Sequence, residues 1–258
     1  MSYRPDLEYR GGRIAQKTDA HARKPLPEFT IPERINGAFL DTIARESGMA
    51  DDTTLKGTRD TLASWRQSFE QLSKVRNAQD PAVTQAAHLN QLAKLTDAAL
   101  TRMSGQFDRA RAGLNLKREA LQGEAIERLG LTTRGQAAEA EIRSALLSMS
   151  AEARQKAISE AIQRGDGEVI YALTNASPLV SGISAENQGT IMRRALLAHA
   201  PDVLRKQEAI DKAQSRLNDG YTAALDAADV VSAKAVADSY RRESQSAAAA
   251  RAELEGQA

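Results

Sequence analysis

The chain has 258 residues, with 35 basic and 34 acidic side chains, a formal net charge of +1 and no cysteine. This balance gives no global field that would draw the protein to nucleic acid or to an anionic membrane, and the lack of cysteine excludes disulfides, thiolate catalysis and cysteine-ligated zinc. Aromatic residues make up only 4% of the chain and charged residues 27%, a mixture typical of helices with thin seams of small residues.

Residues 1–33 are predicted to form an extended N-terminal docking arm. Four of the seven prolines fall there, and a segment interrupted so often cannot hold a long helix. The arm nevertheless contains Tyr3, Tyr9 and Phe29, which is more aromatic surface than a fully solvated tail carries. We therefore expect it to dock, either on another protein or on the chain's own helices.

Residues 34–130 are predicted to form a region of long helices, introduced by a short helix at 33–46. A second helix is expected at 58–77 and a third from Pro81 to Leu129, because Asp80 is a favoured N-cap and Pro81 a favoured first helical residue. Sustained heptad spacing in the third helix predicts a helical partner. The residues of this heptad row are Leu100, Phe107, Leu114 and Leu121.

Residues 131–182 are predicted to form a compact region of short helices at 136–148, 151–164 and 168–175. Gly165 is a natural C-cap and Asp166 a natural N-cap. Aliphatic side chains concentrate from Leu146 to Val180. This region is therefore expected to be a small helical knob.

Residues 183–258 are predicted to contain a helix capped by Ser184 and then one uninterrupted helix from Pro201 to Glu255. That helix would be about 80 Å long, whereas a globule of this chain length has a diameter of about 45 to 50 Å. The heptad row of this helix buries little apolar surface, because the companion row is polar or small. The helix therefore needs neighbouring helices from the same chain or from copies. The large residues of this row are Val203, Ile210, Leu217 and Val231. The expected fold is thus all-α and elongated, with coiled-coil-like seams.

The sequence contains no Walker loop, nucleophile elbow, zinc-protease helix or EF-hand loop. His21, His88 and His199 lie in three different segments without carboxylates at metal-ligand spacing. Five pairs of adjacent basic residues are interleaved with acidic residues, which favours solvated helix faces over a nucleic-acid stripe. We therefore predict no catalytic, cofactor-binding or metal-binding residues, no cofactor and no enzymatic activity.

The proline-interrupted arm, the long helices rich in Ala, Gln and Arg, and the stretch from Ser150 to Ile170 (SAEARQKAISEAIQRGDGEVI) resemble small helical virion and morphogenesis proteins of tailed bacteriophages. The resemblance implies a virion structural protein of internal, ejection or portal-proximal type. It would be made in the host cytoplasm, reside in the virion and assemble in multiple copies by helix packing. Its partners would be copies of itself and other virion proteins such as portal, coat or internal proteins, with no small-molecule substrate.

Two other functions fit the same pattern. A transient capsid scaffolding protein would also be helical and oligomeric, although scaffolds commonly end in a basic helix and this chain ends nearly neutral. A cytoplasmic helical adaptor or nucleic-acid-organising protein is disfavoured by the near-neutral charge. Contact with a membrane is expected only if the protein is ejected with the genome.

Overall fold

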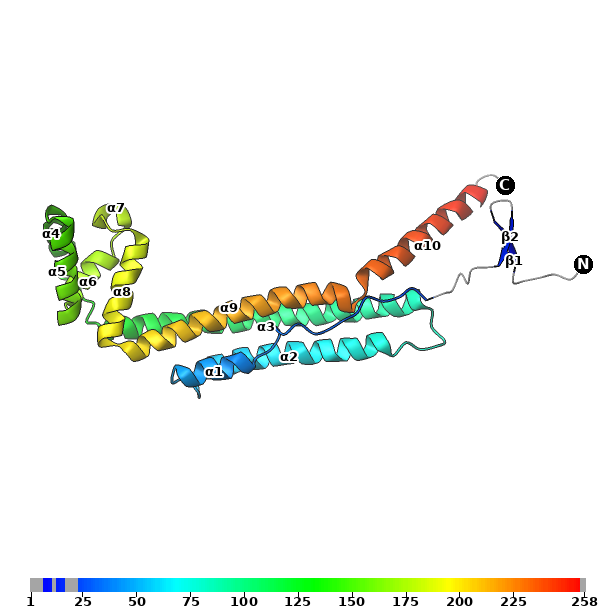
Figure 1. Cartoon of the computed structure of the whole chain (residues 1–258), viewed down its shortest axis with the longest axis horizontal. Coiled ribbons are helices and arrows are strands. Elements are labelled where there is room, and N and C mark those ends of the chain that lie inside the picture. The colour runs from blue at the N-terminus through cyan, green and yellow to red at the C-terminus, as the bar shows by residue number, and fades with distance from the viewer. Residues whose placement is uncertain (1–6, 11–12, 17–22, 256–258) are drawn as a thin grey trace, which may run out of the picture. The chain divides into compact units, whose positions relative to one another are not determined.

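A computed structural model describes residues 7–10, 13–16 and 23–255 (Figure 1). The fold is all-α, as predicted: these residues contain ten helices and one short antiparallel hairpin. The elements are β1 Leu7–Arg10, β2 Arg13–Gln16, α1 Ala38–Glu46, α2 Thr53–Asn77, α3 Gln85–Arg128, α4 Gln136–Ser148, α5 Ala151–Arg164, α6 Gly167–Thr174, α7 Pro178–Ser181, α8 Ala185–His199, α9 Pro201–Val231 and α10 Lys234–Glu255.

The chain divides into two compact units. Unit 1 contains the described residues up to Ile35, together with Ser64–Ser104 and the chain from Tyr221 onward, and unit 2 contains Asn36–Ala63 and Gly105–Gly220. The four segments predicted from the sequence do not coincide with these units, because α2, α3 and α9 each contribute residues to both.

The core of unit 1 is built around the few aromatic residues of the chain. Trp65 and Phe69 of α2 are fully buried, and the Trp65 ring lies 5.8 Å from that of Tyr221 on α9. The Tyr221 hydroxyl in turn shares a 2.7 Å hydrogen bond with Ser104 of α3. These contacts hold together segments of α2, α3 and α9 that are far apart in the sequence.

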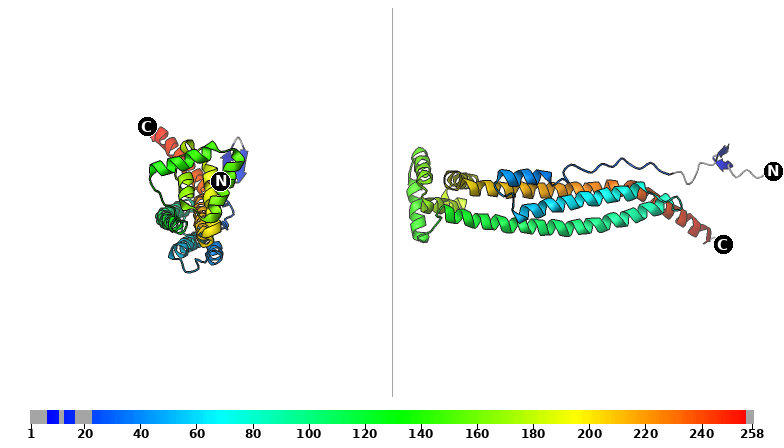
Figure 2. Two further views of the ribbon diagram at one scale, coloured as in Figure 1. Left: turned by 90° about the vertical axis from the view of Figure 1, so that its left-hand side faces the viewer. Right: turned by 90° about the horizontal axis from the view of Figure 1, so that it is seen from below.

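The single C-terminal helix expected from the sequence is wrong, because the chain breaks between α9 and α10 (Figure 2). Ala233 has a φ of +49°, and it is the one described non-glycine residue with a positive φ. A left-handed residue after the last turn is a common way to end a helix, but the position is usually glycine. Because Ala is the best helix former, the sequence carries no signal for this break.

Unit 2 carries the short helices of the predicted knob. Helices α4 and α5 have the predicted bounds, Gln136–Ser148 and Ala151–Arg164. As expected, Gly165 ends α5 in a left-handed conformation, and the Asp166 side chain caps α6 by accepting from the Val169 N–H. The knob has an aliphatic core, and its main members are Leu146, Ile158, Ile162, Ile170, Leu173, Ile191 and Leu196.

The helix start predicted at Asp80–Pro81 is wrong. Pro81 lies in a turn, where the Asp80 carboxylate accepts a 2.8 Å bond from the Ala82 N–H, and α3 begins only at Gln85. Thr84 competes successfully as the cap, since its hydroxyl accepts from the Ala87 N–H at 3.3 Å.

Smaller differences affect three other elements. Helix α1 begins at Ala38 rather than at residue 33, because the chain first makes a turn in which Ile35 N–H donates to the Pro32 carbonyl. Helix α2 begins five residues before the predicted start, at Thr53, where the Asp52 carboxylate caps the helix by accepting from the Leu55 N–H. The one-turn helix α7 was not predicted.

Candidate functional site

In unit 1, residues 24–29, called the strap below, lie along the chain's own helices. The main chain of Lys24 is held by Gln85 of α3, whose side chain accepts from the Lys24 N–H at 2.7 Å and donates to the Lys24 carbonyl at 2.9 Å. The ammonium of Lys24 donates to Ser239 at 2.9 Å, pairs with Glu243 and lies 4.4 Å from the centre of the Tyr240 ring. The strap is thereby joined to both α3 and α10.

The other end of the strap is held by Arg76 of α2 and by an aromatic contact. Arg76 Nη2 donates to the Pro27 carbonyl, and its guanidinium lies 5.9 Å from the centre of the Phe29 ring. The Phe29 ring also lies 6.1 Å from that of Phe69. Of the predicted docking residues, Phe29 therefore packs on the chain itself, Tyr9 lies on β1, and Tyr3 lies outside the described residues.

Arg76 also contacts the break between α9 and α10. Its Nη1 donates to the carbonyls of Val230, at 2.6 Å, and Val231, at 3.4 Å. The residue is only 5% exposed, and this burial lowers the pKa of Arg76 from its ordinary value. The guanidinium nevertheless keeps its charge at physiological pH and so remains a donor to the strap and to the end of α9 together.

The heptad rows predicted as packing seams are mostly buried. In unit 2, α3 and α9 pack along one another: Arg118 pairs with Asp211 at 2.7 Å, and Gln207 donates to the Leu121 carbonyl at 3.3 Å. The helical partner that the heptad spacing predicts is therefore present in the same chain. Fully or almost fully buried members of the rows are Leu114, Leu121, Val203, Ile210, Leu217 and Val231, whereas Leu100 and Phe107 are half-buried.

The first turn of α2 is tied to α3 in unit 2 by Asp52. Its carboxylate accepts from the N–H groups of Thr54 and Leu55 at 3.0 and 3.1 Å and pairs with the Lys117 ammonium at 2.7 Å. Burial alone would raise the pKa of Asp52, but the hydrogen bonds and the charge of Lys117 outweigh it, so that the pKa lies below its ordinary value. The ionised carboxylate thus stabilises this junction.

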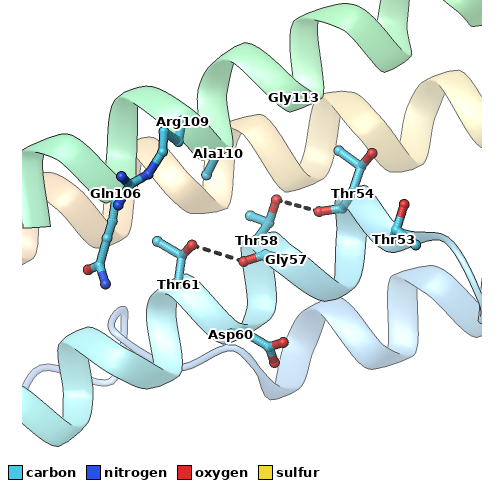
Figure 3. A pocket seen from close by; sticks show the side chains of 10 residues that line it. All are labelled: Thr53, Thr54, Gly57, Thr58, Asp60, Thr61, Gln106, Arg109, Ala110 and Gly113. Atoms are coloured by element: carbon cyan, nitrogen blue, oxygen red, sulfur yellow. Dashed lines mark hydrogen bonds between the residues drawn. The ribbon is translucent and has the colours of Figure 1, made fainter.

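A polar groove of about 490 Å³ runs between α2 and α3 in unit 2 (Figure 3). Its α2 side carries threonines whose hydroxyls bond to their own helix: Thr58 donates to the Thr54 carbonyl and Thr61 to the Gly57 carbonyl, each at 2.9 Å. The lining residues include neither a histidine nor a serine that a base could activate. The groove is lined by hydroxyl, carboxylate, amide and guanidinium groups.

The knob in unit 2 exposes large apolar side chains at the ends of α4 and α7, and these form what we call the tip patch. Leu179 is 95% exposed and Val180 54%. Leu147, at 43%, lies beside Gly182, the residue that ends α7, since a Cβ on Gly182 would lie 2.6 Å from its Cδ2 atom. Met149, in the turn after α4, is 38% exposed. The aliphatic residues up to Val180 were predicted to lie in the knob, but the sequence pattern does not separate these exposed side chains from its core.

The histidines that the structure describes contact main-chain carbonyls. His88 Nε2 lies 3.3 Å from the Arg76 carbonyl, and His199 Nε2 lies 2.5 Å from the Ile162 carbonyl in the last turn of α5. His21 lies outside the described residues. Among the residues with described positions, no group of three His, Asp or Glu side chains gathers to hold a metal ion, and no helix has the length and hydropathy that a membrane span needs.

Each of the five basic pairs has at least one member in an ion pair with a carboxylate. These ion pairs are Lys24–Glu243, Lys117–Asp52, Arg118–Asp211, Arg193–Glu208, Lys206–Glu124 and Arg241–Asp238. Such charges form helix surfaces on which both signs are interspersed.

Comparison with known proteins adds no assignment: no protein family, no curated protein and no solved structure matches this chain. The strap with Arg76 and the helix break in unit 1, and the tip patch in unit 2, are therefore the candidate functional features on which the proposals below depend.

Proposed function

We propose that this protein is a structural component of a tailed-bacteriophage particle, present in several copies and located inside the head or near the portal. The tip patch is the observation that carries the proposal of an assembly function. The knob leaves four large apolar residues exposed at the ends of α4 and α7, and exposed apolar patches mark protein–protein contact sites. The resemblance of the chain to helical virion proteins supports the choice of particle.

The tip patch fits docking on another protein of the particle. Leu179 and Val180 project from a one-turn helix that begins at Pro178, and Leu179 has nearly all of its surface available to a partner. Buried side chains of this size each contribute about 1.5 to 3 kcal/mol. In such a role the protein needs no cofactor and no small-molecule substrate.

Mass spectrometry of purified particles tests the proposed location. An internal or portal-proximal protein is expected in mature particles as well as in procapsids. A protein found in procapsids and lost from mature particles would instead be a transient scaffold, and absence from both would contradict the proposal.

A substitution tests the proposed surface. Replacing Leu179 and Val180 together with Asp is expected to leave the helical content and thermal stability unchanged, because both side chains are exposed, and to reduce incorporation into particles at least tenfold. Leu116→Asp is the matched control, since Leu116 is 68% exposed on α3, outside the tip patch. Normal incorporation of the Leu179 and Val180 variant would show that the patch is not the contact surface.

A further inference from the structure

We propose that the break between α9 and α10 is a strained hinge held bent by the strap, and that release of the strap joins residues 221–255 of unit 1 into one uninterrupted helix. Its two conformations would couple capture of the arm by a partner to the direction of α10. This inference concerns unit 1 alone and does not depend on the proposed function.

The strain at the hinge lies at Ala233. This residue is 1% exposed and has a φ of +49°, a conformation that glycine adopts freely and that most L-residues avoid. The flanking sequence prefers a helix, since neither glycine nor proline occurs between Tyr221 and Glu255. The bent conformation therefore requires contacts from outside the helix to stabilise it.

Arg76 provides one such contact. In an uninterrupted helix, the Val230 carbonyl would accept from the N–H of Lys234, four residues later. In the bent structure this carbonyl instead accepts from the Ala233 N–H at 3.1 Å and from Arg76 at 2.6 Å. The guanidinium thus stabilises the bent main chain by bonding to a carbonyl that the break has released.

The strap holds both Arg76 and α10 in place. Pro27 and Phe29 provide the Arg76 guanidinium with an acceptor and an aromatic neighbour. Lys24 joins Gln85 on α3 to Ser239, Tyr240 and Glu243 on α10. When the strap leaves, Arg76 loses two of its contacts and α10 loses its connection through Lys24. Fewer contacts then oppose the helical preference of the sequence, namely the Arg76 bonds to α9 and the 2.6 Å bond that the Tyr240 hydroxyl donates to Gln85.

A distance measurement on the full-length protein tests this proposal. Because the chain has no cysteine, Thr222→Cys and Arg251→Cys allow two spin labels to be attached at exposed positions. One uninterrupted helix would separate these positions by about 43 Å, and the bent form by less. Pulsed electron paramagnetic resonance is expected to show the shorter distance in the otherwise unchanged chain.

The combined variant Lys24→Ala and Phe29→Ala is expected to shift the label distance to about 43 Å. Adding Ala233→Gly to this variant should raise the ratio of the bent to the straight population at least about tenfold. Glycine removes the left-handed strain of the bent form and weakens the straight helix. Far-UV circular dichroism confirms that each variant remains helical.

Two results would overturn the proposal: a short distance that persists in the Lys24 and Phe29 variant, or a 43 Å population that Ala233→Gly leaves unchanged. If the combined variant loses its helical content, Lys24→Ala alone serves the same test. That substitution removes the contacts to α10 and leaves Phe29 in place, and it should increase the long-distance population. No increase would equally contradict the hinge.

Discussion

The Arg76 guanidinium donates a 2.6 Å hydrogen bond to the carbonyl oxygen of Val230, in the last turn of α9. A cation at this end of a helix interacts favourably with the helix dipole and satisfies a carbonyl that has lost its helical partner. The same guanidinium bonds to Pro27 of the strap. One side chain thus joins three segments that are distant in the sequence.

Arg76→Gln is expected to lower the free energy of unfolding by about 2 to 3 kcal/mol, because hydrogen bonds from a charged donor to buried and partly buried carbonyls are lost. Urea denaturation followed by circular dichroism measures the change. Lys74→Gln on the same helix is the control, and since Lys74 is exposed it should change stability by less than about 0.5 kcal/mol. Equal effects of the two substitutions would show that the Arg76 contacts do not stabilise the fold.

Ala233→Gly is expected to change the free energy of unfolding by less than about 0.5 kcal/mol, because relief of the left-handed conformation offsets the loss of a buried methyl group. Ala237→Gly, four residues later inside α10, should cost about 1 to 2 kcal/mol, since Ala237 is 6% exposed and helical. Thermal unfolding of both variants gives the comparison. If Ala233→Gly were the more costly change, Ala233 would not be strained.

The helix bounds that the sequence predicts correctly are those with local chemical signals. Ser150 and Ser184 cap their helices by accepting from N–H groups three residues later, and Gly165 ends α5 with a φ of +69°. Each signal acts within a few residues, so it can be recognised without knowledge of the tertiary structure.

Most of the features that the sequence could not predict depend on long-range contacts, and one depends on competition between two neighbouring caps. The break at Ala233 is stabilised by Arg76, which lies 154 residues from Val230 in the chain. The early start predicted for α3 failed because two adequate caps, Asp80 and Thr84, compete within five residues. The exposure of Leu179 depends on how α7 lies on the knob, which periodicity cannot show for a helix of four residues.

Gly167→Ala is expected to destabilise the knob by about 3 kcal/mol, because the added Cβ would lie 2.0 Å from the Gly130 carbonyl oxygen, and the main chain of α6 would have to move. Gly123→Ala is the matched control. A Cβ at Gly123 meets no atom within 4 Å, so this change inside α3 should raise stability by up to about 1 kcal/mol. Chemical denaturation of both variants tests the contrast, and a tolerated Gly167→Ala would mean that α6 does not approach Gly130 so closely.

Asp52→Asn is expected to lower stability by about 1 kcal/mol at neutral pH, because the amide keeps a cap oxygen but loses the ion pair with Lys117. The pKa of Asp52 in the folded protein is lower than its ordinary value, so the unfolded chain binds this proton more readily. The contribution is therefore complete above about pH 5 and is lost as the pH falls through the folded pKa, below about pH 4. Denaturation at a series of pH values should show the original chain and Asp52→Asn converging in acid. Asp51→Asn removes an ion pair with Lys56 at a fully exposed carboxylate, where solvent screens the charge, so its stability gap and the change of that gap with pH should both be smaller. A pH-independent gap for Asp52→Asn would mean that the charge of Asp52 does not stabilise the junction.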